Sequence, residues 1–79
     1  MGSDVCVIGA GAFGSSLAYA FAKNSLNIKV WTRNEELMRE WNSTQRNQRS
    51  WPNFSFPKNI VASNDLVHSV KSSPFIVYA

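Results

Sequence analysis

The sequence predicts an α/β fold in which a parallel β-sheet carries α-helices on both faces. Three observations support this prediction. Short β-branched runs alternate along the chain with segments of helical periodicity. A glycine-rich turn, residues 9–14, joins the first apolar run to the first helical segment. The final apolar run, residues 75–79, has no helix after it, so we expect an incomplete sheet with about the first four strands of a longer protein.

The first three elements follow from local pattern. Val5 to Ile8 is a continuous apolar run, typical of a strand that is buried on both faces. Apolar residues then recur at helical spacing from Phe13 to Lys23, and Asn24-Ser25 can end this helix. Ile28 to Trp31 predicts the second strand.

A second helix is predicted to begin at Asn34, whose side chain can cap its free amides. Glu35 and Glu36 then lie where the helix dipole favours negative charge. The apolar stripe of this helix consists of Leu37, Met38 and Trp41. Residues 42–58 are polar, contain two prolines and predict a long connection.

The remaining elements are shorter. Ile60 to Ala62 predicts a third strand, and Ser63 is expected to cap a third helix. One side of that helix carries the apolar residues Leu66, Val67 and Val70. Pro74 precedes the final strand, Phe75 to Ala79. This order of strands and helices favours a parallel sheet joined by right-handed crossovers.

Composition limits the class of protein. The chain is 44% hydrophobic and 16% charged, as expected of a globular domain, and its net charge is +3. The basic residues form no concentrated stripe, so we do not expect a nucleic-acid partner. No apolar run has membrane-spanning length and no signal peptide is evident. A single cysteine, Cys6, excludes a disulfide framework within the chain and favours a reducing, cytoplasmic location.

The stretch VIGAGAFGSS, residues 7–16, is the main candidate site. Gly9, Gly11 and Gly14 have G-x-G-x-x-G spacing between a strand and a helix, which is the context of a Rossmann-type dinucleotide site. Gly9 allows a tight turn, Gly11 lets a pyrophosphate approach the backbone, and Gly14 lets the helix pack closely. The amides of Ala12 and Phe13 begin the helix and suit a diphosphate. The alternative is a glycine turn that binds nothing.

Residue roles around this turn remain open from pattern alone. Phe13 can face either the core, which its large apolar side chain favours, or the cofactor. The second strand is followed by Thr32, Arg33 and Asn34 rather than by an acid that would hold a ribose 2′-hydroxyl. Arg33 can stack on adenine, pair with a 2′-phosphate or remain a solvated loop residue, so both NAD and NADP are allowed.

Other reactive side chains carry no predicted chemistry. Cys6 is expected to be buried and inert, and His68 to lie on the polar side of its helix. Ser15 and Ser16 are interpreted as small helix residues, and no metal-ligand cluster is present in the sequence.

Three segments resemble, in register, the N-terminal sequence of NAD(P)-dependent glycerol-3-phosphate dehydrogenases. GAGAFGSSLAYAFAKN followed by IKVWTRN is similar to the family pattern GAGxWGxxLAxxLAxNGxxVxxWxRD. NQRSWP, residues 47–52, resembles N-x-x-Y-[LF]-P, and FPKNIVASND, residues 56–65, resembles LPxNIxATxD. FIVYA corresponds to the strand before the family's V-P-[ST] turn. The chain departs from the family at Ser25, Ser50 and Pro74, where the family has glycine, tyrosine and an acid.

The resemblance implies reversible oxidation of sn-glycerol 3-phosphate to dihydroxyacetone phosphate, a reaction of glycerophospholipid metabolism. The implied pyrophosphate-binding residues are Gly9, Ala10, Gly11, Ala12, Phe13 and Gly14. Phe13 then lies beside the cofactor, and Arg33 lies near the adenosine. The family's catalytic lysines and helical substrate domain would follow residue 79, so residues 1–79 are predicted to be the N-terminal part of a dinucleotide-binding Rossmann domain that is inactive alone. We expect the full-length protein to bind a small phosphorylated substrate and to form a homodimer.

Two other interpretations remain. The chain could begin another two-domain dehydrogenase, similar to ketopantoate reductase or 6-phosphogluconate dehydrogenase, although NQRSWP and FPKNI argue against this. It could also be a non-catalytic module that senses a dinucleotide.

Overall fold

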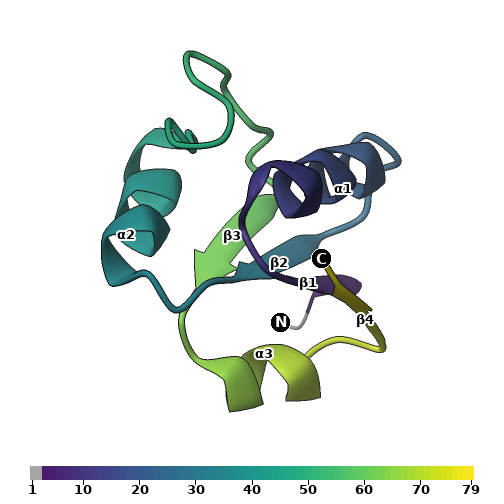
Figure 1. The fold of residues 1–79 in the computed structure, drawn as a ribbon. Helices are drawn as coiled ribbons and strands as arrows, with labels where there is room; N and C mark the ends of the chain where they lie inside the picture. The colour runs from purple at the N-terminus through teal and green to yellow at the C-terminus, as the bar shows by residue number, and fades with distance from the viewer. Residues whose placement is uncertain (1–2) are drawn as a thin grey trace.

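A computed structural model, which describes residues 3–79, contains one four-stranded parallel sheet with strand order β3–β2–β1–β4. The strands are β1 (Val5–Ile8), β2 (Ile28–Trp31), β3 (Ile60–Ser63) and β4 (Phe75–Tyr78). The helices are α1 (Ala12–Ala22), α2 (Glu35–Thr44) and α3 (Leu66–Lys71). Helices α1 and α2 lie on one side of the sheet and α3 lies on the other (Figure 1). The predicted Rossmann-type α/β fold is therefore confirmed.

The strands end together at one edge of the sheet. Ile8 of β1 pairs with both Trp31 of β2 and Tyr78 of β4, and Trp31 pairs with Ser63 of β3. Ligands of open parallel sheets bind outside the carboxyl ends of the strands. The glycine turn after β1 and the Arg33 loop after β2 both lie at this edge, because their strands are in register.

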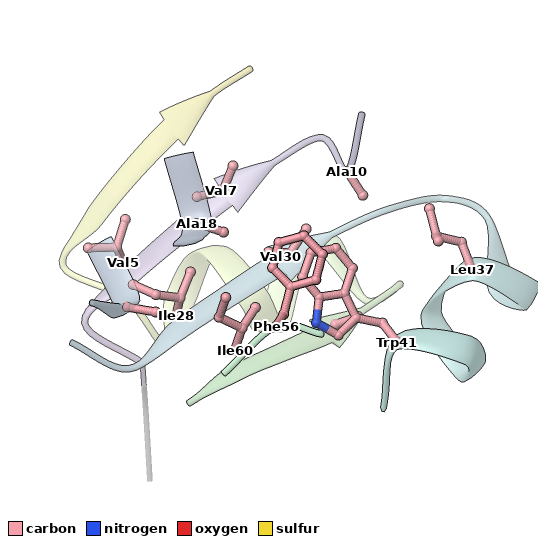
Figure 2. Close-up of a cluster of buried hydrophobic side chains, with 12 residues drawn as sticks. Val5, Val7, Ala10, Ala18, Ile28, Val30, Leu37, Trp41, Phe56 and Ile60 are labelled. Carbon is pink, nitrogen blue, oxygen red and sulfur yellow. The ribbon is translucent and has the colours of Figure 1, made fainter. Parts of the chain in front are cut away.

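The main core lies between the sheet and the two helices α1 and α2. Val7 and Val30 point from the central strands into this core and are fully buried. Trp41 of α2 stacks on Phe56, with 4.6 Å between ring centroids and 29° between ring planes (Figure 2). Phe56 comes from the connection between α2 and β3, so this connection contributes to the core.

The second helix and its connection differ from the prediction. Asn34 caps α2 as expected, because its side chain accepts a hydrogen bond of 3.0 Å from the Leu37 amide. The helix continues to Thr44 and ends where Gln45 adopts a left-handed conformation with φ of 60°. The connection therefore begins at residue 45 rather than 42, and it is anchored by buried Phe56 instead of being wholly polar.

The third helix was predicted with the wrong cap. Strand β3 extends through Ser63, whose hydroxyl accepts a hydrogen bond from the Asp65 amide. Asp65 is the cap, since its side chain accepts from the His68 amide at 3.0 Å. Ser69 is the buried residue of α3. The apolar residues predicted on one side of this helix are exposed, namely Leu66, Val67 and Val70.

Ser25 ends the first helical segment in a left-handed conformation, with φ of 66°. The family that the sequence resembles has glycine there, which adopts this conformation without steric cost. The helix end predicted at Asn24-Ser25 is confirmed, and Ser25 adopts the left-handed conformation that the turn requires.

Candidate functional site

The glycine turn connects β1 to α1, and two of its glycines are required by the fold. Gly9 has a φ of +122°, which side chains rarely allow, and a Cβ there would lie 2.9 Å from the Ala79 carbonyl oxygen. A Cβ on Gly14 would lie 2.0 Å from the carbonyl oxygen of Gly9. Helix α1 therefore begins in direct contact with the turn, and the close approach expected at Gly14 is present.

Gly11 has different surroundings. Its φ of −74° and ψ of −170° suit any residue, and a Cβ there would meet no atom within 4 Å. Gly11 caps α1 without a side-chain hydrogen bond, and the first turn of the helix contains no acidic residue. A glycine is therefore not needed here for the fold, and the space in front of it is open to a ligand.

The start of α1 offers free hydrogen-bond donors beside this space. Within residues 3–79, the amides of Gly11, Ala12 and Phe13 donate to no acceptor. Unpaired amides at a helix N-terminus, together with the helix dipole, favour an anion. The turn is thus chemically suited to a diphosphate group.

Phe13 lies at the start of α1 and is 66% exposed. The interpretation of Phe13 as a core residue is therefore wrong. Helix α1 instead buries four small residues, Gly14, Ser15, Ala18 and Ala22. Small side chains let the helix lie close to the sheet, and this orientation turns Phe13 outward at the same end as the open space.

Arg33 is the exposed basic residue of the loop that follows β2. Three neighbouring polar side chains, those of Thr32, Asn34 and Glu35, are engaged with other groups. Thr32 accepts a hydrogen bond from the Asn34 amide at 3.1 Å, and Asn34 caps α2. Glu35 forms an ion pair with Arg39. No ion pair or hydrogen bond within residues 3–79 engages the Arg33 guanidinium, so it is available to a ligand at this edge.

Three side chains that hold the glycine turn were not identified from the sequence. Asn47 is fully buried, and its Nδ2 donates to the Ala10 carbonyl at 2.8 Å and to the Ser15 hydroxyl at 3.0 Å. Trp51 Nε1 donates to the Ala12 carbonyl at 3.2 Å. Ser15, interpreted as only a small helix residue, donates to the Ala10 carbonyl at 3.3 Å. The contact between Asn47 and Ala10 joins residues 37 positions apart, so no local pattern indicated it.

The remaining reactive groups lie away from this edge or lack partners. Cys6 is buried in the middle of β1, and burial raises the pKa of its thiol although Lys29 opposes the shift. His68 is exposed on α3, as predicted. In the described part of the chain, no group of three His, Cys, Asp or Glu side chains could hold a metal ion. None of the helices between residues 3 and 79 has the length and apolar character needed to cross a bilayer.

Comparison with known sequences identifies the family. The sequence pattern of the family described as "NAD-dependent glycerol-3-phosphate dehydrogenase N-terminus" matches residues 4–79. The chain belongs to this family. The resemblance predicted from the three sequence segments is therefore confirmed.

Relatives within the family are longer proteins. A Neisseria gonorrhoeae glycerol-3-phosphate dehydrogenase [NAD(P)+] is 34% identical over 73 residues, which cover 92% of this chain and 22% of that protein. One from Clostridium acetobutylicum is 37% identical over 75 residues, covering 95% of this chain and 23% of that protein. The chain thus spans about a fifth to a quarter of the length of these relatives.

Solved structures of the family share the fold. The glycerol-3-phosphate dehydrogenase of Coxiella burnetii superimposes with a TM-score of 0.88 at 26% identity, covering 98% of this chain and 24% of that one. The enzyme from Saccharomyces cerevisiae gives a TM-score of 0.87 at 29% identity, covering 100% of this chain and 26% of that one. The arrangement of strands and helices described above is therefore that of these dehydrogenases.

Proposed function

We propose that the chain is the N-terminal part of the cofactor-binding domain of an oxidoreductase that interconverts sn-glycerol 3-phosphate and dihydroxyacetone phosphate. The observation that supports this most directly is the open space at Gly11, bordered by free helix amides, in a chain matched along residues 4–79 by the dehydrogenase family. The cofactor is NAD or NADP, as the name of the relatives states for them.

The glycine turn binds the cofactor through its backbone. The proposed binding residues are Gly9, Ala10, Gly11, Ala12, Phe13, Gly14 and Arg33. The amides at the start of α1 donate to the diphosphate, while Phe13 offers an exposed aromatic surface beside it. When the cofactor is bound, its nicotinamide gives or takes the hydride. This part of the protein binds and orients the cofactor, and the catalytic residues belong to the region after residue 79.

The same proposal covers the remaining properties of the full-length protein. It would act in the cytoplasm on a small phosphorylated substrate, contribute to glycerophospholipid metabolism and form a homodimer. The lengths of the relatives, of which this chain covers 22% and 23%, support a larger polypeptide with a separate substrate domain.

Turnover by the full-length protein tests the proposed function. We expect it to oxidise NADH or NADPH when dihydroxyacetone phosphate is added, as measured by the loss of nicotinamide absorbance. Glyceraldehyde 3-phosphate, an isomer of the substrate, is the matched control and should give little turnover. Cofactor binding without turnover would instead support a dinucleotide-sensing module, and turnover with a ketopantoate or 6-phosphogluconate substrate would support another dehydrogenase.

Arg33 is expected to favour cofactors with a 2′-phosphate, because its guanidinium is free and no acid stands at residues 32–34, directly after β2. In the full-length protein, Arg33→Ala should raise the dissociation constant of NADPH about tenfold and that of NADH about twofold. Fluorescence titration with each cofactor measures both constants. Lys58→Ala, at an exposed lysine outside the proposed site, should change neither. Equal weakening of NADPH and NADH would contradict a contact with the 2′-phosphate.

A further inference from the structure

The connection between α2 and β3 reaches across the molecule to the backbone of the glycine turn. Asn47 and Trp51, at the two ends of a short turn in this connection, each donate a side-chain hydrogen bond to a carbonyl of residues 10–12. Asn47 also donates to Ser15, whose hydroxyl reaches the same Ala10 carbonyl. Neither side chain needs to touch a ligand to affect the turn, because both act on its peptide groups.

The geometry of the peptide group explains what these hydrogen bonds do. In a planar trans peptide, the carbonyl of one residue and the amide of the next point in opposite directions. The Ala10 carbonyl therefore shares its peptide plane with the Gly11 amide, and the Ala12 carbonyl shares its plane with the Phe13 amide. Holding the carbonyls toward the connection turns both amides away from it. These two amides are among the free amides at the start of α1, beside the open space.

The orientation of the peptide group between Ala10 and Gly11 depends most on hydrogen bonds from the connection. Ala10 lies between β1 and α1, so its carbonyl has no partner in the sheet or helix. Its hydrogen bonds come from Asn47 at 2.8 Å and Ser15 at 3.3 Å. Ala12, by contrast, is already the first residue of α1, and its peptide follows the helix axis. The Asn47 contact should therefore matter more than the Trp51 contact.

The connection is rigid enough to act in this way. The Trp51 amide donates to the Asn47 carbonyl at 2.8 Å, which closes the turn that carries both side chains. The Trp51 ring packs on Phe54, with 4.9 Å between centroids, and Phe56 stacks on Trp41 in the core. Asn47 is fully buried, so its amide group is held by surrounding atoms rather than by solvent.

We propose that Asn47 and Trp51 are positioning residues, which orient the Gly11 and Phe13 amides toward the diphosphate of the cofactor. This inference rests on the proposed function, because it requires that the turn binds a dinucleotide. Trp51 makes its contact through the indole Nε1, a hydrogen-bond donor that phenylalanine lacks.

Comparison of ADP with AMP as inhibitors tests this role in the full-length protein. The two ligands share the adenosine and differ by the second phosphate, which the oriented amides would bind. We expect Asn47→Leu to reduce the preference for ADP over AMP, measured as the ratio of inhibition constants against NADH, about tenfold. Trp51→Phe keeps an aromatic ring and should reduce this ratio about twofold to threefold. The inhibition constant of AMP should stay within about twofold in both variants.

A merely structural role would weaken ADP and AMP equally, and that result, or an unchanged ratio in folded variants, would overturn the inference. If Asn47→Leu does not fold, the double variant Ser15→Ala with Trp51→Phe takes its place, because it removes the hydrogen bonds from Ser15 to the Ala10 carbonyl and from Trp51 to the Ala12 carbonyl. It keeps the Asn47 bond to Ala10, so we expect a reduction of the ratio at least as large as that of Trp51→Phe but smaller than that of Asn47→Leu. Wild-type protein that binds neither NADH nor ADP would instead refute the proposed function itself.

Discussion

The substitution Gly14→Ala is expected to prevent stable folding of the chain. The added methyl group would lie 2.0 Å from the carbonyl oxygen of Gly9 and 3.2 Å from the Ala79 Cβ, and the first of these is a backbone atom that no rotamer change can move. Replacing a glycine inside a helix with alanine normally stabilises the protein by up to about 1 kcal/mol. At Gly14 the contact with the Gly9 carbonyl makes the same replacement destabilising. We expect the free energy of unfolding to fall by about 4 kcal/mol or more.

Urea denaturation followed by circular dichroism measures this loss. Small domains are marginally stable, so a decrease of this size removes most or all of the folded population. Gly11→Ala is the matched control, because it adds the same methyl group to the same turn where no atom lies within 4 Å. If Gly14→Ala were as stable as wild type, α1 could not begin as close to Gly9 as the structure has it.

The substitution Gly11→Val is expected to abolish dinucleotide binding while leaving the fold intact. The valine side chain would fill the open space beside the free amides of the turn, where the diphosphate is proposed to lie. The backbone of Gly11 is already in an extended conformation that valine adopts without strain. We expect the dissociation constant of NADH to rise more than about 100-fold, which corresponds to a loss of about 2.8 kcal/mol or more.

Calorimetric titration of the full-length protein with NADH measures this change, and thermal unfolding without cofactor checks the fold. The melting temperature should change by only a few degrees, since valine is a slightly poorer cap than glycine at the start of a helix. Unchanged affinity for NADH would count against the glycine turn as the diphosphate site. A large decrease in melting temperature would show that Gly11 has a structural role that its open surroundings do not indicate.

Much of the fold follows from local pattern. The bounds of β1 and β2 agree with the sequence prediction. The continuous apolar run of β1 marks a strand that is buried on both faces, and Ile28 and Val30 of β2 are buried on alternate positions. The Asn34 cap was also predictable, since an N-cap depends on a side chain and an amide only three residues apart. Local pattern alone left the family of the protein open. The resemblance of three segments to one dehydrogenase family predicted it, and the family match over residues 4–79 confirms that prediction.

Two predictions failed because the outcome depends on residues that are far apart in the chain. Ser63 could cap the third helix in isolation, but pairing with β2 extends β3 through it and leaves Asp65 as the cap. Phe13 has the size and polarity of a core residue, yet α1 approaches the sheet through its small side chains and leaves Phe13 exposed. Neither outcome depends on sequence neighbours alone.

The sequence by itself determined the order of strands and helices, the place of the glycine turn and the absence of an acid directly after β2. These features depend on contacts within a few residues and on the residue types present. Only the tertiary structure decided that Gly11 faces open space while Gly14 meets the backbone, and that Asn47 and Trp51 hold the carbonyls of the turn. The physical reason is that these contacts join segments far apart in the chain, so they exist only once α1 and the connection before β3 have packed against the same end of the sheet.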